Sequence, residues 1–545
     1  MEEQTLHPRT IPALLDQAAA RFSDVEALVD GKLRLSFQDL RERAIRVSAA
    51  LMAEGVVSGN RVAIWAPNSA RWVAAALGVI GAGGVLVPVN TRYKGNEARD
   101  IIGRSEARVV FTEDDFLGNG YVTMLRGVHG DEDESDTLSG APWAAVGLPA
   151  VRSVVSFDLA AASEDCTAWD DFLARGLAIS DAEVEARWSA VSESDPADVL
   201  FTSGSTGKPK GAMATHVQNV RTYDAWCERI GLRSGDRYLI VNPLFHTFGY
   251  KAGLLACLLR GSTAVLQETF EVSETMGLIE QERITVLPGP PTIYTAILDS
   301  HDHRRFDLST LRLAVTGAQS VPVALVRRIR TELFPEVLTA YGLTEAAGTV
   351  TVSALGDSDE KVALTSGRPL DGVEVRIGDV HGQPLELGKD GEVLVRGYNV
   401  MSGYLDDSAG TAESIKDGWL HTGDVGRLDE HGYLSITGRI KDMFTIGGFN
   451  VYPAEVEAAL AQHPAISQVA VIGVPDHRMG EVGHAFVVTR DRAPLNFEEL
   501  ITFSRNRLAN FKVPRGVTFL TELPVNAAGK VDKLRLGSDH RPDPG

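Results

Sequence analysis

The sequence predicts an α/β fold in which a mostly parallel sheet is covered by helices, followed by a small β subdomain and a compact C-terminal unit. The first observation is a rhythm of helix-like and strand-like patterns over the first 110 residues. Helix-like patterns at 38–54 and 69–82 alternate with short apolar strands at 62–65 and 85–89. Such alternation is typical of parallel sheets with helices on their faces.

The second observation is a change of pattern after residue 372. Short strands at 373–377 and 391–395 alternate with turn dipeptides as far as residue 438, which predicts a small antiparallel β subdomain. Residues 440–545 have a βα pattern of their own and carry no net charge, although the whole chain of 545 residues carries −20. The sequence therefore predicts a separate C-terminal unit.

The composition argues against several classes of protein. The chain has 73 acidic and 53 basic residues, and nucleic acid as a main partner would need a basic surface. Its three cysteines are far apart, which argues against a disulfide framework or a structural zinc site. We see neither a signal peptide nor an apolar stretch of about 20 residues, so we expect a cytoplasmic protein with no stable membrane anchor.

Residues 117–150 interrupt the alternation. They contain glycine-rich stretches and the acidic run 131–136, and we expect a solvated surface insertion. Alternation resumes near residue 197, with strands predicted at 238–241, 284–287 and 311–315.

Residues 202–211, T-S-G-S-T-G-K-P-K-G, have the composition of a phosphate-binding loop. Small residues let backbone N–H groups approach phosphate oxygens, hydroxyls add donors, and the two lysines add positive charge. The loop is not a Walker A loop, because two residues separate Gly204 from Gly207 and a proline follows Lys208, which disfavours a P-loop kinase. The predicted contacts are Thr202, Ser203, Gly204, Ser205, Thr206, Gly207, Lys208 and Lys210.

This segment resembles the signature loop of the adenylate-forming superfamily, which comprises acyl-CoA synthetases, luciferases and the adenylation domains of peptide synthetases. Further segments match in order: Y-G-L-T-E at 341–345, G-W-L-H-T-G-D at 418–424, G-R-I-K-D at 438–442 with G-G-F-N-V-Y-P-A-E-V-E at 447–457, and N-A-A-G-K at 526–530. The matching motifs therefore extend over most of the chain.

The resemblance implies a large N-terminal lobe of stacked α/β sheets with a β-barrel-like subdomain, and a small mobile α+β C-terminal domain. The implied bounds are 1–438 for the lobe, with its β subdomain at about 350–438, then a hinge at 439–442 and the mobile domain at 443–545.

The family's reaction has two halves. A carboxylate attacks the α-phosphate of ATP to give acyl-AMP and pyrophosphate, and a thiol then displaces AMP. The resemblance thus implies an ATP-dependent carboxylate–CoA ligase that uses ATP, Mg²⁺ and coenzyme A on a small carboxylic acid. Because the first half brings anions together, it needs charge neutralisation and positioning. A homodimer is compatible with this interpretation.

The resemblance implies catalytic roles for three residues. Lys530 reaches the α-phosphate and the carboxylate, Thr344 donates a hydrogen bond to the α-phosphate, and Glu345 binds Mg²⁺, which prefers a few carboxylates together with phosphate oxygens. Tyr341 offers an aromatic face to adenine unless it is a core tyrosine. Asp424 can accept hydrogen bonds from the ribose hydroxyls, unless it serves only a β-turn. The remaining implied nucleotide contacts are Gly317, Ala318, Gln319, Gly342 and Arg439, and the implied hinge residues are Lys441 and Asp442.

The acyl pocket and the coenzyme A path are also implied by the resemblance. Residues 243–250 are rich in aromatic side chains, which favours an apolar acid. No aspartate is evidently placed for an ammonium group, which argues against amino-acid adenylation. His246 is either an aromatic gate or an ordinary core histidine. The pocket residues are Phe245, His246, Phe248, Gly249, Gly289, Pro290 and Leu343, and the coenzyme A residues are Gly447, Gly448, Lys512 and Arg515.

Longer stretches at 245–253, 284–294 and 338–345 are similar to a narrower group, the actinobacterial acyl-CoA synthetases of steroid degradation. This similarity implies a bicyclic indanedione-propanoate as substrate, although the insertion at 117–150 departs from the group's pattern. The alternatives are a medium-chain fatty or aryl acid CoA ligase, an acyl-AMP ligase that loads a carrier protein, and a non-catalytic nucleotide-binding protein. A luciferase-like oxygenase shares the same motifs.

Overall fold

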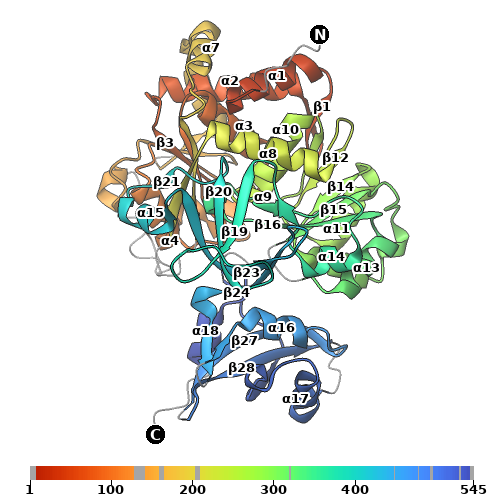
Figure 1. Cartoon of the computed structure of the whole chain (residues 1–545). Coiled ribbons are helices and arrows are strands. Elements are labelled where there is room, and N and C mark those ends of the chain that lie inside the picture. Colours follow the sequence, from red (N-terminus) through yellow and green to blue (C-terminus); the bar gives the residue numbers. More distant parts are fainter. Residues whose placement is uncertain are drawn as a thin grey trace.

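The computed structural model describes residues 8–127, 142–158, 165–202, 209–317, 321–446, 449–476, 478–490, 495–526 and 530–539. It consists of a large N-terminal lobe and a small C-terminal domain, drawn in blue below the lobe in Figure 1. The two parts are joined by β24, Leu434–Arg439, and by a 3-10 turn at Ile440–Asp442. The predicted α/β architecture with a separate C-terminal unit is confirmed.

The first large sheet of the lobe has nine strands. They are β1 Glu26–Asp30, β2 Leu33–Ser36, β12 Arg237–Ile240, β13 Thr263–Leu266, β14 Val286–Pro288, β15 Leu313–Gly317, β16 Glu336–Tyr341, β17 Thr351–Val352 and β18 Arg368–Pro369. Their order is β18-β17-β16-β15-β14-β12-β13-β1-β2. The strands from β16 to β1 are parallel, and β2, β17 and β18 pair antiparallel. The strands predicted at 238–241, 284–287 and 311–315 are present with slightly shifted ends.

The second large sheet has eight strands. They are β3 Arg61–Trp65, β4 Val85–Pro88, β5 Val109–Thr112, β8 Ser153–Ser156, β9 Thr167–Ala168, β10 Pro196–Thr202, β11 Lys210–Thr215 and β21 Gly403–Tyr404. Their order is β21-β11-β10-β4-β3-β5-β8-β9. All pairs from β10 to β9 are parallel, whereas β11 and β21 pair antiparallel at one edge. The edge strand β21 is thus far in sequence from β11, the strand with which it pairs.

Helices fill the space between the two sheets and cover their outer faces. The inner helices are α1 Ile11–Phe22, α2 Phe37–Ala53, α3 Ala70–Gly81, α6 Trp169–Arg175, α7 Asp181–Ser189, α8 His216–Ile230 and α10 Ala256–Arg260. The outer helices are α11 Val272–Gln281, α12 Pro291–Asp299, α13 Val323–Glu332 and α14 Asp359–Leu364 on the first sheet, and α4 Gly95–Arg104 and α5 Tyr121–Arg126 on the second. Both faces of each sheet are therefore covered.

Alternation of side chains along the strands explains this layering. In β3, Val62 and Ile64 join the inner core, whereas Ala63 and Trp65 join the outer core. Successive side chains of a strand point to opposite faces, so a strand that is apolar at every position is buried on both sides. The continuous apolar runs in the sequence therefore mark central strands of covered parallel sheets.

The expected solvated insertion at 117–150 is wrong for its described ends. Tyr121 and Leu125 of α5 are fully buried, and Trp143 and Val146 of a 3-10 turn pack in the same core. The guanidinium of Arg126 lies 3.8 Å from the ring centroid of Trp143. Apolar side chains on either side of the acidic run anchor these ends, and a two-stranded ribbon, β6 Asp115–Phe116 and β7 Asn119–Gly120, precedes them. The run 131–136 lies outside the described residues.

The β subdomain is a five-stranded antiparallel sheet. Its strands are β19 Val373–Gly378, β20 Gly391–Gly397, β22 Ile415–Lys416, β23 Trp419–Leu428 and β24, and helix α15, Ser408–Ser414, precedes β22. The structure differs from the predicted start near residue 350, because β17 and β18 pair with the first large sheet. β23 and β24 lie at the base of the lobe, next to the C-terminal domain (Figure 1).

The C-terminal domain is built on a sheet with its own core. The strands are β25 Phe444–Ile446, β26 Phe449–Val451, β27 Ile466–Asp476, β28 Gly480–Thr489 and β29 Gly516–Leu520. The helices are α16 Pro453–Leu460, α17 Phe497–Arg505 and α18 Lys533–Asp539. Val471 packs with α16 and α17, whereas the adjacent Ile472 packs with Leu536 of α18. Helices thus cover both faces of this sheet.

A buried ion pair joins the strand before the phosphate loop to the segment after the aromatic run 243–250. Lys251 lies on a π-helix, Tyr250–Leu255, which follows the short helix α9, Thr247–Gly249. Its Nζ lies 2.8 Å from Oδ1 of Asp198, and the two side chains are 1% and 0% exposed. Asn219 of α8 donates a hydrogen bond of 2.6 Å to the other oxygen of Asp198. Removing one partner of such a pair strands the other charge in an apolar environment.

We predict that Lys251→Met lowers the free energy of unfolding of the N-terminal lobe by about 3–5 kcal/mol, because Asp198 loses its counter-charge. The double variant Lys251→Met/Asp198→Leu should recover most of that loss, since it removes both charges. Calorimetric and denaturant unfolding of the two variants and the parent protein measure the difference. Wild-type stability of the single variant would contradict this account.

A second buried group makes the lobe sensitive to acid. His216, the first residue of α8, is 1% exposed and accepts a hydrogen bond of 3.2 Å at Nδ1 from the backbone N–H of Ile11. Burial lowers the pKa of His216 to about 4, with the charge of Asp195 opposing the shift. An unfolded chain binds this proton near pH 6.5, so the stabilisation is complete above that pH and is lost as the pH falls towards 4.

We predict that His216→Asn reduces the loss of stability between pH 7 and pH 4.5, because asparagine can accept the same hydrogen bond and does not titrate. The parent protein should lose up to about 3 kcal/mol more of its free energy of unfolding than His216→Asn as the pH falls from above 6.5 to below 4. Urea unfolding at a series of pH values tests this, with His431→Asn as control, since His431 is 66% exposed. If the free energy of unfolding of His216→Asn and of the parent protein fell equally with pH, His216 would not be a cause of the acid sensitivity.

Candidate functional site

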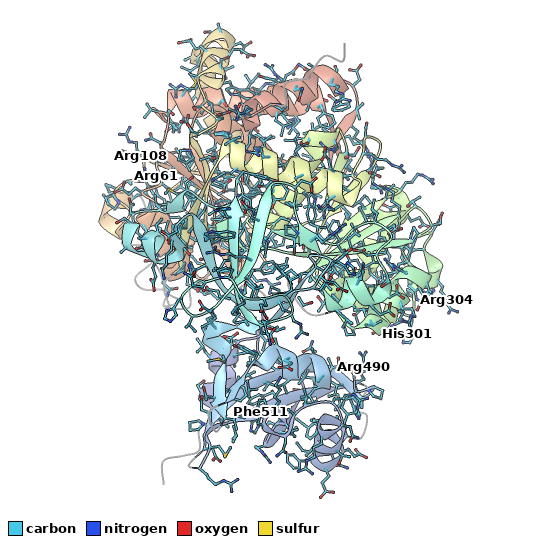
Figure 2. The ribbon with its side chains drawn as sticks, in the orientation of Figure 1. Arg61, Arg108, His301, Arg304, Arg490 and Phe511 are labelled. Carbon is cyan, nitrogen blue, oxygen red and sulfur yellow. The ribbon has the colours of Figure 1, made fainter. Side chains whose placement is uncertain are left out.

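A cleft of 4530 Å³ lies where the carboxyl ends of the strands of both large sheets face the C-terminal domain. Residues at strand ends line it, among them Thr202 of β10, Gly317 of β15 and Tyr341 of β16. On the other side, Lys530 and Arg490 of the C-terminal domain line the same cleft. Figure 2 shows Arg490 on the edge of the domain that faces the lobe. Ligands of open α/β sheets bind at such strand ends.

The carboxylate of Asp424 is held by two other side chains of the cleft. It lies on β23 and is 3% exposed as a residue. The hydroxyl of Tyr341 donates a hydrogen bond of 2.7 Å to Oδ2, and Nε of Arg439 donates one of 2.7 Å to Oδ1. Burial, together with the Asp424 charge, raises the pKa of Tyr341 far above its usual range, so the phenol stays a neutral donor. Asp424 is thereby held as a charged acceptor in one orientation.

The loop that carries Asp424 is fixed by a second carboxylate. One oxygen of Glu392 on β20 lies 2.7 Å from Nδ1 of His421, and the other accepts a hydrogen bond of 3.1 Å from the backbone N–H of Gly423. Asp424 itself donates its backbone N–H to the hydroxyl of Thr422 at 3.1 Å. Glu392 was not identified from the sequence, where only the register of β20 against β23 could have indicated it.

The segment 341–345 turns sharply after β16. A Cβ on Gly342 would lie 2.1 Å from the carbonyl oxygen of Gly348, so only glycine allows this close approach of the backbone. Thr344 and Glu345 begin a 3-10 turn and line the cleft half-buried. The hydroxyl of Tyr404 donates a hydrogen bond of 3.0 Å to Oε1 of Glu345.

The ends of the predicted phosphate loop lie beside this segment. Thr202 and Lys210 face each other across β10 and β11, so the loop closes an antiparallel hairpin at the cleft. Nζ of Lys210 lies 3.6 Å from Oδ2 of Asp407 and 4.9 Å from the ring centroid of Tyr404. The predicted residues Ser203, Gly204, Ser205, Thr206, Gly207, Lys208, Ala318, Gln319, Gly447 and Gly448 lie outside the described residues.

Lys530 is one of the charged residues that the C-terminal domain contributes to the cleft. Its pKa is lowered by the protein atoms around it and by the positive charges of Arg439 and Lys441, while Asp424 and Glu345 oppose the shift. Its backbone N–H donates a hydrogen bond of 3.1 Å to Oδ1 of Asn526.

The positive charge of Lys530 also affects the pKa of a histidine of the N-terminal lobe. Desolvation by the surrounding protein atoms, together with the positive charge of Lys530, lowers the pKa of His246 to about 4. Nδ1 of His246 accepts a hydrogen bond of 3.1 Å from the backbone N–H of Phe248, as expected of a neutral imidazole whose other nitrogen carries the proton. Lys530 thus lines the cleft together with His246 and the carboxylates of Asp424 and Glu345.

The predicted acyl-pocket residues separate into two groups. Those that line the cleft are Phe245, His246, Phe248, Pro290 and Leu343. Gly249 and Gly289 are not among the lining residues, and a Cβ on Gly249 would lie 2.3 Å from the carbonyl oxygen of Pro243. These two glycines allow close packing behind the wall.

Two aromatic residues of α8 were missed by sequence reasoning. Tyr223 and Trp226 line the inner end of the cleft, and the rings of Trp226 and Phe248 meet edge to face at 6.3 Å. The two residues are three positions apart on a helix that follows the phosphate loop, which could have indicated that both line the site. The same spacing is also typical of ordinary core residues.

The remaining predicted residues lie at the hinge and in the C-terminal domain. Lys441 and Asp442 belong to the 3-10 turn that joins the two parts, and both line the cleft. Lys512 is held by Glu455, whose two oxygens lie 2.6 and 2.7 Å from its Nζ. Arg515 is exposed, and neither it nor Lys512 is among the lining residues. The role of these two residues in coenzyme A binding stays a prediction.

Within the described part of the chain, no three His, Cys, Asp or Glu side chains gather in a way that could hold a metal ion. Glu345 is a carboxylate at the cleft beside Thr344 and Lys210. Mg²⁺ in nucleotide sites takes one or two carboxylates and completes its coordination with phosphates and waters. This donor set therefore fits a metal ion that enters together with a nucleotide. None of the described helices is long and apolar enough to cross a membrane.

Two family models match the chain. The model of the AMP-binding enzymes matches residues 15–405, and that of the AMP-binding enzyme C-terminal domain matches residues 455–530. Residues 406–454, which include Asp424 and Arg439, lie between the two matches.

Relatives of known activity match over nearly the full length. A 7a-methyl-1,5-dioxo-octahydroindenyl-propanoyl:CoA ligase from Rhodococcus jostii is 49% identical over 539 residues, with 98% of this chain and 100% of that protein covered. The ligase of the same name from Mycobacterium tuberculosis is 48% identical over 530 residues, covering 97% and 98%.

A solved structure shares the fold. The anthranilate CoA ligase AuaEII, in complex with anthranoyl-AMP, superposes with a TM-score of 0.82 at 26% identity and covers 97% of both chains. With both family models matched and relatives near half identity over the full length, the chain belongs to the family of AMP-binding enzymes.

Proposed function

We propose that this protein is an ATP-dependent carboxylate–CoA ligase, which forms an acyl-adenylate and then a thioester and releases pyrophosphate and AMP. The observation that carries this proposal is the position of Lys530. Lys530 lines the same cleft as His246, on its aromatic wall, and as the carboxylates of Asp424 and Glu345. A cation at that point can neutralise a substrate carboxylate and the α-phosphate at once.

In the first half-reaction the lobe binds ATP and the C-terminal domain supplies Lys530. A carboxylate has about four acceptor positions, so Asp424 can accept the ribose hydroxyls while Tyr341 and Arg439 hold it. Thr344 donates to the α-phosphate, and the loop between Thr202 and Lys210 surrounds the outer phosphates. Mg²⁺, held by Glu345, would neutralise charge on the phosphates when ATP is bound. The acid's oxygen then displaces pyrophosphate.

In the second half-reaction the thiol of coenzyme A displaces AMP from the acyl-adenylate. The two half-reactions need different groups at the same carbonyl, and the turn at Ile440–Asp442 is the connection about which the C-terminal domain would rotate. Rotation about Lys441 withdraws Lys530 and brings the Gly447–Gly448 segment to the thiol path. The domain bounds of 1–438, 439–442 and 443–545 are part of this proposal.

The proposed acid is the bicyclic, steroid-derived propanoate with two ring ketones. Its support is the activity for which two relatives, at 49% and 48% identity, are named, together with a cleft lined by Tyr223, Trp226 and Phe248. Broad aromatic walls suit a rigid, mostly apolar ring system. Mg²⁺ as the metal, a cytoplasmic location and a homodimer stay predictions.

Mass spectrometry of a reaction with Mg²⁺, ATP, coenzyme A and a panel of acids tests the proposal. The panel holds linear acids of several lengths, aryl acids and the bicyclic propanoate. We predict AMP and an acyl-CoA from the bicyclic acid in clear preference to the others. Turnover of linear or aryl acids alone would refute the substrate, and absence of AMP with every acid would refute the ligase.

The role of Lys530 has its own test. We predict that Lys530→Ala slows acyl-AMP formation by at least about 100-fold, because the developing charge loses its counter-ion, while supplied acyl-AMP is still converted to acyl-CoA. Pyrophosphate release and thioester formation are measured separately. Lys32→Ala, at the exposed turn between β1 and β2, serves as control. Equal loss of both half-reactions would show that Lys530 has no specific part in adenylation.

A further inference from the structure

Tyr404 connects three segments that the sequence keeps far apart. It lies on β21, the edge strand that reaches the second large sheet from beyond β20, and it is 8% exposed. Its hydroxyl donates a hydrogen bond of 3.0 Å to Oε1 of Glu345. Nζ of Lys210, at the end of the phosphate loop, lies 4.9 Å from its ring centroid.

The backbone around Tyr404 is held on both sides. The N–H of Met401 donates to the carbonyl of Glu345 at 2.8 Å, and the N–H of Leu405 donates to the carbonyl of Gly211 on β11 at 2.8 Å. Tyr404 therefore has a fixed position relative to both the 341–345 segment and strand β11. A hydroxyl anchored in this way can orient a half-buried carboxylate.

The hydrogen bond has a consequence for the carboxylate of Glu345. A carboxylate oxygen only accepts, so the phenol hydroxyl of Tyr404 is the donor of this bond. It occupies Oε1, and among the described residues no hydrogen-bond donor to Oε2 is found. One oxygen is thus engaged by the protein and the other is left for a ligand.

We propose that Tyr404 is a positioning residue, whose hydroxyl orients Glu345 so that its second oxygen binds the Mg²⁺ that enters with ATP. The inference rests on the proposed function, since it assigns Glu345 to the metal. Groups that hydrogen-bond to a metal ligand fix its orientation, and their loss typically weakens metal affinity by about 10- to 100-fold.

Tyr404→Phe tests the proposal because it removes only the hydroxyl and keeps the ring beneath Lys210. Tyr398→Phe is the matched control. The hydroxyl of Tyr398 donates to the carbonyl of Asp371 at 3.0 Å, and its ring carries the guanidinium of Arg221 at 4.1 Å, so the same atom is removed from a similar environment without any contact to Glu345.

The measurement is calorimetric binding of a non-hydrolysable ATP analogue, α,β-methylene-ATP, to the full chain at a series of Mg²⁺ concentrations. We expect the half-saturating Mg²⁺ concentration to rise about 10-fold in Tyr404→Phe and to stay at the wild-type value in Tyr398→Phe. Binding of the analogue without metal should be the same in all three proteins. In turnover, KM for Mg·ATP should rise and KM for the acid should not.

A double-mutant cycle separates orientation of Glu345 from a general structural role. If Tyr404 acts through Glu345, Tyr404→Phe adds no further loss of Mg²⁺ dependence to Glu345→Gln. A full additional loss in that background, or equal Mg²⁺ dependence of the two phenylalanine variants, would overturn the inference. A wild-type protein that binds the analogue with Mg²⁺ but produces no AMP from any acid would instead overturn the proposed function.

Discussion

The cleft depends on one buried carboxylate. Asp424 belongs to the β subdomain, Tyr341 to the end of the first large sheet and Arg439 to the connection with the C-terminal domain, and the three meet at hydrogen-bond distance. A buried charge is tolerated only when it is paired and hydrogen-bonded. The hydrogen bonds to Asp424 therefore hold the three units in fixed relative positions. The remaining acceptor positions of the carboxylate face the cleft.

The two large sheets contribute different chemistry because of how their strands end. The first sheet ends in Gly317 and Tyr341, and the second ends in the hairpin between Thr202 and Lys210. The π-helix after residue 249 connects these two halves through the pair of Lys251 with Asp198. Ionic groups this deep contribute little net stability, but they allow one arrangement of the segments that surround them.

The C-terminal domain adds a further cation, Lys530, to those that the lobe contributes to the cleft. Lys210 is occupied by Asp407 and Arg439 by Asp424, whereas Lys530 reaches the cleft from a separate body on a short connection. A cation delivered in this way can be withdrawn when the next step needs the space, which a residue on a sheet could not achieve.

The sequence by itself determined the fold class, the family and the segments that carry the chemistry. Residues 202–211, 341–345 and 418–424 could be recognised because binding a phosphate, turning sharply at Gly342 and presenting Asp424 are each specified by a few neighbouring residues. The strands of both sheets could be predicted from their continuous apolar runs for the same local reason.

Only the tertiary structure decided which groups meet. Tyr404 lies 59 positions from Glu345, Glu392 lies 31 positions from Gly423, and Lys251 lies far from Asp198, so no local pattern marks these pairs. The same holds for the buried ends of the segment 117–150, whose composition indicates solvent exposure. Whether two groups form a hydrogen bond or an ion pair depends on their distance and burial in the folded protein. Their separation along the chain predicts neither the distance nor the burial.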